Sequence, residues 1–304
     1  MVRAAPLRMF VAMALLLAPA SPVARPGVAS PPDEDGYELW MRYRPVSDAA
    51  RRDGYRRALT HLLVQGESPT LSAAREELAS GLGGLLGTPV PVSRVVRGDG
   101  AVVAGTPAGS PLVASLGLDR ALRGVGDEGF LLRSMPVGGR RAVVIAANRD
   151  VGVLYGAFDL LRRLQTGQPL EQLAVASAPR IRLRALDHWD NLDGSVERGY
   201  AGGSLWDWDS LPGALSPRYR DYARANASLG INGVVLTNVN ANSRVLTAPY
   251  VARVAALANV FRPYGLRVWL TARFSAPLEI GGLATADPLD AGVRAWWRAK
   301  ADEI

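Results

Sequence analysis

Carboxylates, amides, an indole and a histidine are crowded into one segment of this chain, LDHWDNLDGSVERGYAGG at Leu186–Gly203. Carboxylate and amide groups suit the recognition of sugar hydroxyls, because together they offer several hydrogen-bond donors and acceptors. The indole of Trp189 could pack on the apolar C–H face of a pyranose ring. The segment leaves the end of an expected β-strand and therefore predicts a saccharide site at that point.

Each of these residues also has a purely structural interpretation. Trp189 could be a core residue that plugs the mouth of a barrel. Asp190 and Asn191 could form a tight turn, as Asx side chains often do, and taken alone they favour that turn. Trp206 and Trp208, which follow in the chain, either rim a saccharide groove or are buried indoles that anchor their loop.

Two later strand ends carry further candidates. Asn238 and Asn240 follow a second expected strand, and in an extended segment their amides would share one face while Val239 points to the other. Paired amides fit hydroxyl recognition, whereas the alternative is an Asn-x-Asn turn. Arg273 leaves a third expected strand, where it could neutralise the carboxylate of a ligand or pair with a neighbouring acid.

Acidic residues are numerous at these strand ends, but the sequence fixes no two of them on opposite sides of a bond, as a glycosidase requires. They are Asp187, Asp190, Asp193, Glu197, Glu279 and Asp287. We therefore assign no catalytic residue. With two histidines, no cysteine and no ligand-like spacing, we expect no transition-metal site.

After residue 178 the pattern alternates strictly between strand and helix. Expected strands cover 180–188, 231–237 and 266–272, and expected helices cover 219–229, 249–261 and 293–304. Such a series forms parallel strands with right-handed crossovers. Polar groups follow all three strands and no glycine-rich nucleotide turn follows any of them, which favours a barrel over a doubly wound sheet. The predicted fold class is α/β, with an N-terminal α+β domain followed by the first three units of an incomplete (β/α)8 TIM barrel.

Residues 33–178 mix short strands and helices in the manner of an α+β domain. Expected helices cover 70–86 and 151–164, and expected strands cover 58–64, 90–96, 101–104, 130–135 and 141–146. The last two strands are expected to pair as a hairpin. The stretch 165–178 resembles a linker, so the barrel domain is predicted to cover 179–304.

The first residues resemble an export signal. Met1–Ala20 places Arg3 and Arg8 before and at the start of an apolar run and ends in small residues, as secretory signal peptides do. We expect a flexible leader up to residue 32 and a secreted or periplasmic protein without a membrane anchor. The formal charge of +7 is spread along the chain without a basic block, so no nucleic-acid partner is expected. Nothing indicates the oligomeric state.

Long strings of the chain resemble the α-glucuronidases of glycoside hydrolase family 67, and the similarity covers nearly everything after Asp33. These strings are ELWMRYRP at Glu38–Pro45, LDHWDNLDGSVERGYAGGS at Leu186–Ser204, YARANASLGINGVVLTNVNA at Tyr222–Ala241 and VFRPYGLRVWLTARFSAPLEIGGLATADPLD at Val260–Asp290.

The resemblance implies an activity and a partner. Enzymes of this family release glucuronic acid or its 4-O-methyl ether, α-1,2-linked to the terminal xylose of short xylo-oligosaccharides, with inversion and without a metal or organic cofactor. By resemblance, Trp189 walls the uronic-acid pocket and Val239 makes room for the 4-O-methyl group. Weaker assignments, which rest only on motif position at the barrel mouth, are Asp190, Asn191, Asn238, Asn240 and Arg273.

The resemblance also implies that this chain is truncated. In the family the barrel is completed by later strands, which carry the general acid and the basic carboxylates, and a mostly helical domain follows. We expect a chain that stops at Ile304 to be inactive and poorly soluble by itself, because three parallel strands leave an unpaired edge. The alternatives are a non-catalytic carbohydrate-binding protein and another barrel glycosidase, similar to hexosaminidases.

Overall fold

The computed structural model describes residues 35–304. The expected signal peptide and the leader up to residue 32 lie outside the described residues. Residues 35–38 are the end of a separate N-terminal unit, in which Tyr37 N donates a hydrogen bond to Asp35 Oδ1 at 2.9 Å. All helices and strands of the described chain belong to the unit Leu39–Ile304.

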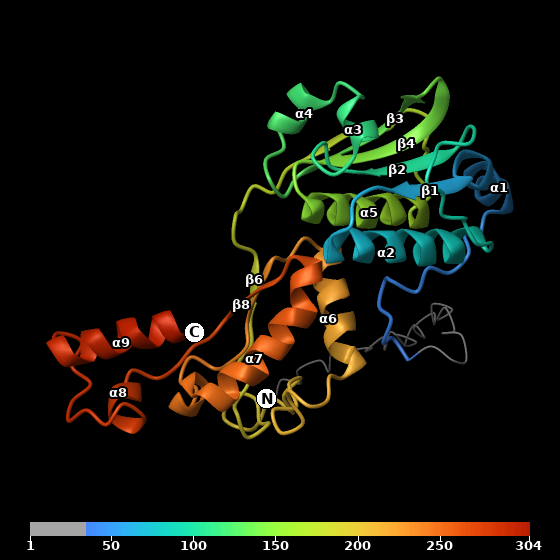
Figure 1. Ribbon diagram of the computed structural model, residues 1–304. Coiled ribbons are helices and arrows are strands. Elements are labelled where there is room, and N and C mark those ends of the chain that lie inside the picture. Colours follow the sequence, from blue (N-terminus) through green and yellow to red (C-terminus); the bar gives the residue numbers. More distant parts are fainter. Residues whose placement is uncertain (1–34) are drawn as a thin grey trace, which may run out of the picture. The chain divides into compact units, whose positions relative to one another are not determined.

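The first sheet has five strands in the order β1-β2-β4-β3-β5 (Figure 1). Their bounds are β1 His61–Val64, β2 Ala101–Gly105, β3 Phe130–Val137, β4 Arg140–Ala147 and β5 Ala174–Ser177. β1, β2 and β4 are parallel neighbours, and β3 is antiparallel to β4 and β5. The predicted hairpin of β3 and β4 is confirmed. Its two-residue turn is Gly138–Gly139, whose positive φ angles suit a tight hairpin turn.

Helices lie on both faces of this sheet. α2 (Pro69–Leu86) and α5 (Asp150–Gln165) pack against one another on one face, and α3 (Pro111–Ala114) and α4 (Asp119–Arg123) lie on the other (Figure 1). Strand side chains alternate between two apolar clusters, which explains why these strands are apolar throughout.

The helix expected over 70–86 is confirmed as α2, and the residues at its two ends are common at helix termini. Ser68 Oγ accepts a hydrogen bond from Leu71 N at 3.1 Å, and Pro69 occupies the first turn, where its missing N–H costs nothing. Gly87 ends the helix in the left-handed conformation, with φ +66°. The glycines near this end therefore belong to a helix terminus.

The second sheet contains three parallel strands in sequence order (Figure 1). They are β6 Ala185–Asp187, β7 Gly233–Val235 and β8 Arg267–Trp269. The helices after them are α6 Pro217–Ser228, α7 Ala248–Phe261, α8 Ala276–Glu279 and α9 Ala291–Glu303, with 3-10 turns η1 Ser243–Leu246 and η2 Arg262–Tyr264. Three consecutive strand-helix units with neighbouring strands form the first arc of a barrel, so the predicted α/β class is confirmed.

A buried ion pair joins α2 to α6. Arg224 donates from Nε to Glu77 Oε2 at 2.9 Å and from Nη2 to Glu77 Oε1 at 3.0 Å. Tyr43 donates its hydroxyl to the same carboxylate at 2.5 Å, and the Glu77 side chain is only 4% exposed. One apolar cluster contains residues of both sheets around this contact. The domain boundary near residue 178 stays a prediction.

Several expected elements are wrong in part. The stretch 90–96 is no strand: Val92 forms a single bridge with Leu62, and Val92 and Val95 are exposed. Residue 58 ends the helix α1 (Ala49–Ala58), which was not expected because its apolar positions are few. The stretch 165–178 is not a plain linker, because its end pairs with β3 as β5. The three barrel strands are shorter than expected, at three residues each.

Candidate functional site

The loops that follow β6, β7 and β8 meet at one edge of the second sheet, here named the carboxyl edge and made up of residues 188–204, 238–242 and 270–279. Because the strands are parallel and in register, their ends point the same way. Main-chain hydrogen bonds join the loops: Asn238 N donates to Asp190 O at 2.8 Å and Arg273 N donates to Ala241 O at 3.3 Å. The sequence-predicted residues from three separate strands are therefore brought together along this edge.

Trp189 and Val239 are both exposed at this edge, at 43% and 45%. Trp189 is therefore not a plug in the core of the described chain. Glu197 N donates to Trp189 O at 2.8 Å, so the main chain that carries the indole is held while the ring stays accessible. An exposed indole and an exposed apolar side chain on neighbouring loops of this edge offer apolar surface for a sugar ring. The role of each residue in binding stays a prediction.

Asp190 is buried, with 2% exposure. Its Oδ2 accepts hydrogen bonds from Ser204 Oγ at 2.6 Å and from Leu205 N at 3.1 Å, and its Oδ1 lies 3.7 Å from His188 Nδ1. Burial acts to raise the pKa of Asp190, but the interactions with His188, Ser204 and Leu205 outweigh it, so the pKa lies below its usual range. Asp190 is thus a buried carboxylate that stays ionised.

His188 lies behind the indole of Trp189, in an aromatic cluster. Its Nε2 is 2.7 Å from Tyr222 Oη, and its ring centroid is 5.1 Å from that of Trp206. Burial raises the pKa of Tyr222, which keeps its hydroxyl protonated and able to donate to the imidazole. Sequence reasoning missed Ser204 as the partner of Asp190 and Tyr222 as the partner of His188. The one available signal was the spacing of 188 and 190, which in extended backbone places both side chains on one face.

The indoles of Trp206 and Trp208 anchor their loop from inside. They are 1% and 2% exposed, and Trp206 Nε1 donates to Leu236 O at 3.0 Å. Of the two alternatives left open, the buried one is therefore correct.

The amides of this edge bond mainly to their own loops. Asn191 Nδ2 donates to Ser195 Oγ at 3.0 Å and to Glu197 O at 2.8 Å. Asn238 is buried and its Oδ1 accepts from Asn240 N at 2.9 Å, so Asn238 and Asn240 form a turn rather than one face of an extended segment. The expected shared face is wrong because the strand β7 already ends at Val235. The Asn240 side chain is exposed.

Arg273 pairs with a neighbouring acid, as one of the two alternatives proposed. Its Nη1 is 3.6 Å from Glu279 Oε1, with about half of the guanidinium side chain still exposed. Ser275 Oγ donates to the same Oε1 at 2.5 Å. The hydrogen bond from Ser275 and the nearby Arg273 charge lower the pKa of Glu279. Arg273 remains accessible to an anion from the solvent side.

Three acids of the carboxyl edge, Asp190, Asp193 and Glu279, are poor proton donors. The pKa values of Asp190 and Glu279 lie below their usual range, and so does that of Asp193, which accepts from Ser195 Oγ and Ser195 N within its own turn. A general acid needs the opposite shift. Within residues 35–304, no group of three or more His, Cys, Asp or Glu side chains could hold a metal ion, and no helix is long and apolar enough to span a bilayer.

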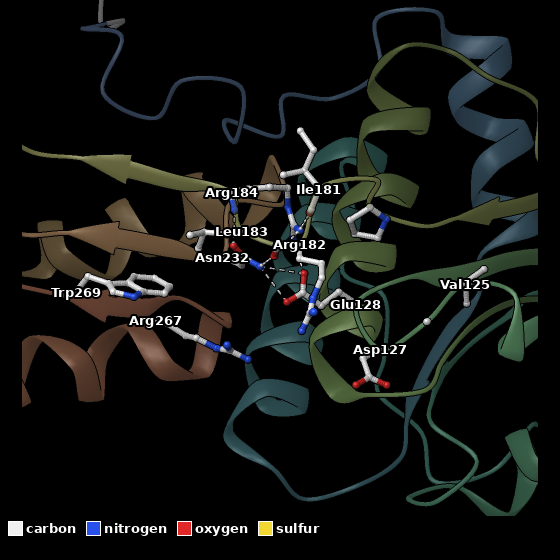
Figure 2. A pocket seen from close by; sticks show the side chains of 12 residues that line it. Val125, Asp127, Glu128, Ile181, Arg182, Leu183, Arg184, Asn232, Arg267 and Trp269 are labelled. Atoms are coloured by element: carbon white, nitrogen blue, oxygen red, sulfur yellow. Dashed lines mark hydrogen bonds and ion pairs between the residues drawn. The ribbon is translucent and has the colours of Figure 1, made fainter. Parts of the chain in front are cut away.

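A hollow of about 770 Å³ lies at the opposite ends of the same strands (Figure 2). There Asn232 Nδ2 donates to both oxygens of Glu128, at 3.0 and 3.1 Å, and Arg184 pairs with the same carboxylate. Arg184 also donates to Gly230 O at 2.5 Å. These groups satisfy one another and join β6, β7 and the residues before β3. None of the predicted site residues lines this hollow, and the ligand sites of barrels lie at the carboxyl ends.

Comparison with known protein families supplies the assignment. A model described as the glycosyl hydrolase family 67 N-terminus matches residues 39–160, and one described as the family's middle domain matches residues 163–304. The chain belongs to glycosyl hydrolase family 67. The resemblance noted in the sequence is thereby confirmed.

Two named relatives are similar along most of the chain. Alpha-glucuronidase A of Emericella nidulans is 35% identical over 280 residues, which cover 89% of this chain and 32% of that protein. Probable alpha-glucuronidase A of Aspergillus oryzae is 35% identical over 283 residues with the same coverage. The family 67 chain described here thus spans about a third of the length of these relatives.

A solved structure agrees in fold. It is a family 115 4-O-methyl-α-glucuronidase with specificity for decorated arabinogalactans, matched with a TM-score of 0.54 and 16% identity over 81% of this chain and 34% of that chain. At this identity the likeness concerns the fold alone.

Proposed function

We propose that the family 67 protein to which these residues belong is an α-glucuronidase. In this proposal it hydrolyses the α-1,2 bond between (4-O-methyl)glucuronic acid and the terminal xylose of short xylo-oligosaccharides, with inversion. Membership of the family and relatives named alpha-glucuronidase A support the glucuronic-acid part. The xylo-oligosaccharide part rests on the resemblance of the four sequence strings.

The observation that carries the proposal is the exposure of Trp189 and Val239 on two hydrogen-bonded loops of the same sheet edge. They are exposed at the ends of adjacent parallel strands, and the hydrogen bond from Asn238 N to Asp190 O ties their two loops together. In our proposal the indole packs on the uronic-acid ring and the small valine leaves room for a 4-O-methyl group. A larger side chain at position 239 would exclude that methyl group.

The polar residues of the carboxyl edge have different roles in this proposal, and some contact the substrate while others shape the loops. Arg273 attracts the carboxylate of the substrate, because its guanidinium is half exposed and only loosely paired with Glu279. The exposed amide of Asn240 contacts a hydroxyl. Asp190, Asn191 and Asn238 act mainly by shaping the loops, since their side chains already bond within them.

Inverting hydrolysis needs a protonated acid on one side of the bond and a carboxylate that activates water on the other, about 6.5–9.5 Å apart. Asp190 and Glu279 do not fit the first role, because their pKa values are lowered. We therefore propose that the proton donor is neither Asp190 nor Glu279. From the resemblance to the family alone, we also propose that residues 1–304 bind the uronic acid without cleaving it. The substrate-binding half of the mechanism is assigned to this chain, and the proton-transfer half is not.

The test compares the complete gene product with the 304-residue chain on xylo-oligosaccharides that carry (4-O-methyl)glucuronic acid. We expect uronic acid release by the first and none by the second. No release by the complete product would refute the proposed activity, and release by the 304-residue chain would refute the division of roles. Release of an N-acetylated sugar, or binding without any cleavage by the complete product, would support the alternatives instead.

A further inference from the structure

Trp189 stands between two residues whose side chains point to the opposite side. Successive side chains of extended backbone alternate between faces. The burial follows this rule: Trp189 is 43% exposed, whereas Asp190 is 2% exposed and His188 is partly buried. Contacts that fix the side chains at 188 and 190 therefore also fix the main chain between them, from which the indole extends.

Asp190 is held by contacts from two other parts of the chain. Its carboxylate accepts from Ser204 Oγ at 2.6 Å and from Leu205 N at 3.1 Å, on the far side of the loop. Its main-chain oxygen accepts from Asn238 N at 2.8 Å, on the next strand end. Asp190 directly follows Trp189 in the chain. Its main-chain oxygen bonds to Asn238, which directly precedes Val239. Asp190 therefore connects the segments that carry these two side chains.

His188 is also held in place, by contacts with β7, α6 and Trp206. His188 N donates to Val235 O at 3.0 Å, and its ring bonds to Tyr222 Oη on α6 and packs against Trp206. Nδ1 faces the Asp190 carboxylate at 3.7 Å. Each ring nitrogen therefore has a polar neighbour, a hydroxyl at Nε2 and a carboxylate at Nδ1.

We propose that His188 and Asp190 are positioning residues that hold the indole of Trp189 and the side chain of Val239 in one fixed arrangement before the sugar arrives. This inference rests on the proposed function, from which it takes Trp189 and Val239 as the residues that contact the sugar. The positioning role of Asp190 is argued from its own contacts. The inference assigns to Asp190 a part that its chemistry as a carboxylate would not suggest, since the group faces away from the ligand side.

Fixing the indole in advance matters for binding. A side chain that must be ordered on binding lowers affinity by up to about tenfold, and a reacting group displaced by about 1 Å can cost about 10²-fold in rate. Loss of the Asp190 carboxylate removes the bonds to Ser204 and Leu205 and leaves the indole free to turn. We expect about a tenfold loss of affinity for glucuronic acid.

The experiment uses the family 67 protein labelled with 5-fluorotryptophan and observed by ¹⁹F NMR. Trp189→Phe assigns the Trp189 signal, and the signals of Trp296 and Trp297 on α9 report whether the chain is folded. The variants are Asp190→Ala, Asp190→Asn and the matched control Asp193→Asn, an exposed carboxylate of the same loop whose bonds stay within its own turn.

In the free protein we expect the Trp189 signal to move toward that of free 5-fluorotryptophan in Asp190→Ala. The shift should be smaller in Asp190→Asn, which keeps an oxygen acceptor for Ser204 and Leu205, and absent in Asp193→Asn. An unchanged Trp189 signal in folded Asp190→Ala overturns the inference. If the Trp296 and Trp297 signals show that Asp190→Ala is unfolded, the Trp189 signal of Asp190→Asn is compared with wild type instead. An unchanged signal in that variant then overturns the inference.

A glucuronic acid titration separates this inference from the proposed function. The wild-type Trp189 signal should respond to the sugar, and Asp190→Ala should need about tenfold more of it. If the wild-type signal does not respond at all, the proposed uronate contact fails, while the spectra of the free variants still judge the positioning role. Equal affinities of wild type and Asp190→Ala overturn the positioning role even where the contact is real.

Discussion

The buried pair of Glu77 and Arg224 offers a stability prediction whose size follows from its geometry. Arg224→Met removes two guanidinium hydrogen bonds, at 2.9 and 3.0 Å, and leaves Glu77 with its hydrogen bond from the Tyr43 hydroxyl. Breaking a buried pair from one side costs about 3–5 kcal/mol, because an uncompensated charge stays buried. Arg224 is 22% exposed, so some water can reach the carboxylate, and we expect about 3 kcal/mol.

The double variant Glu77→Leu/Arg224→Met is the matched control. Replacing both charges by apolar groups of similar volume removes the stranded charge, and the remaining loss should be about 1 kcal/mol for the Tyr43 hydroxyl that loses its acceptor. Urea unfolding followed by tryptophan fluorescence measures both free energies. A loss below about 1 kcal/mol in Arg224→Met, or a double variant less stable than the single one, would refute the reasoning.

Three further outcomes are expected. Trp206→Ala should cost about 3–5 kcal/mol in unfolding free energy as a buried indole is lost, whereas Trp206→Phe should lose less because most of the ring remains; equal losses would contradict the packing argument. Gly233→Val should destabilise the chain, because a Cβ there would lie 2.3 Å from Trp269 Cζ3, whereas Gly98→Ala, with open space around it, should be neutral in thermal unfolding. The pKa of Asp190 is lower in the folded state, so the ionised carboxylate stabilises the fold fully above the unfolded pKa of about 3.9, and this stabilisation is lost as the pH falls through the folded pKa. The difference in unfolding free energy between wild type and Asp190→Asn should therefore shrink only below about pH 4. A difference that already shrinks near pH 6 would contradict this.

Elements with local signals were predicted well. Ser68, Pro69 and Gly87 mark both ends of α2, and two glycines mark the β3–β4 turn. These signals act between residues a few positions apart, so they are visible in the sequence. The strand expected at 90–96 failed for the opposite reason, since valines there form no ladder and stay exposed. Strand formation depends on a partner that the local pattern does not reveal.

The sequence predicted that the candidate site residues lie at one edge of the sheet, but it did not predict most of their side-chain contacts. Parallel strands bring their ends to one edge, so the convergence of Trp189, Val239 and Arg273 followed from the alternation of strand and helix. The bonds of Asn238 and Asn240 did not follow, because an extended segment and a turn use the same residue types. Likewise, the ion pair of Arg273 with Glu279 was one of two equal alternatives.

Residue types and their order along this chain were enough to give its strand-helix alternation, its likeness to family 67 and the indole at a strand end. They could not give which polar groups point inward. The carboxylate of Asp190 became a buried, ionised brace through Ser204 and Leu205, and Trp206 became core through Leu236. Those partners lie 14 to 30 positions away, and contacts at such distances form only when the chain has folded back on itself, because burial and hydrogen bonding are decided by neighbours in space.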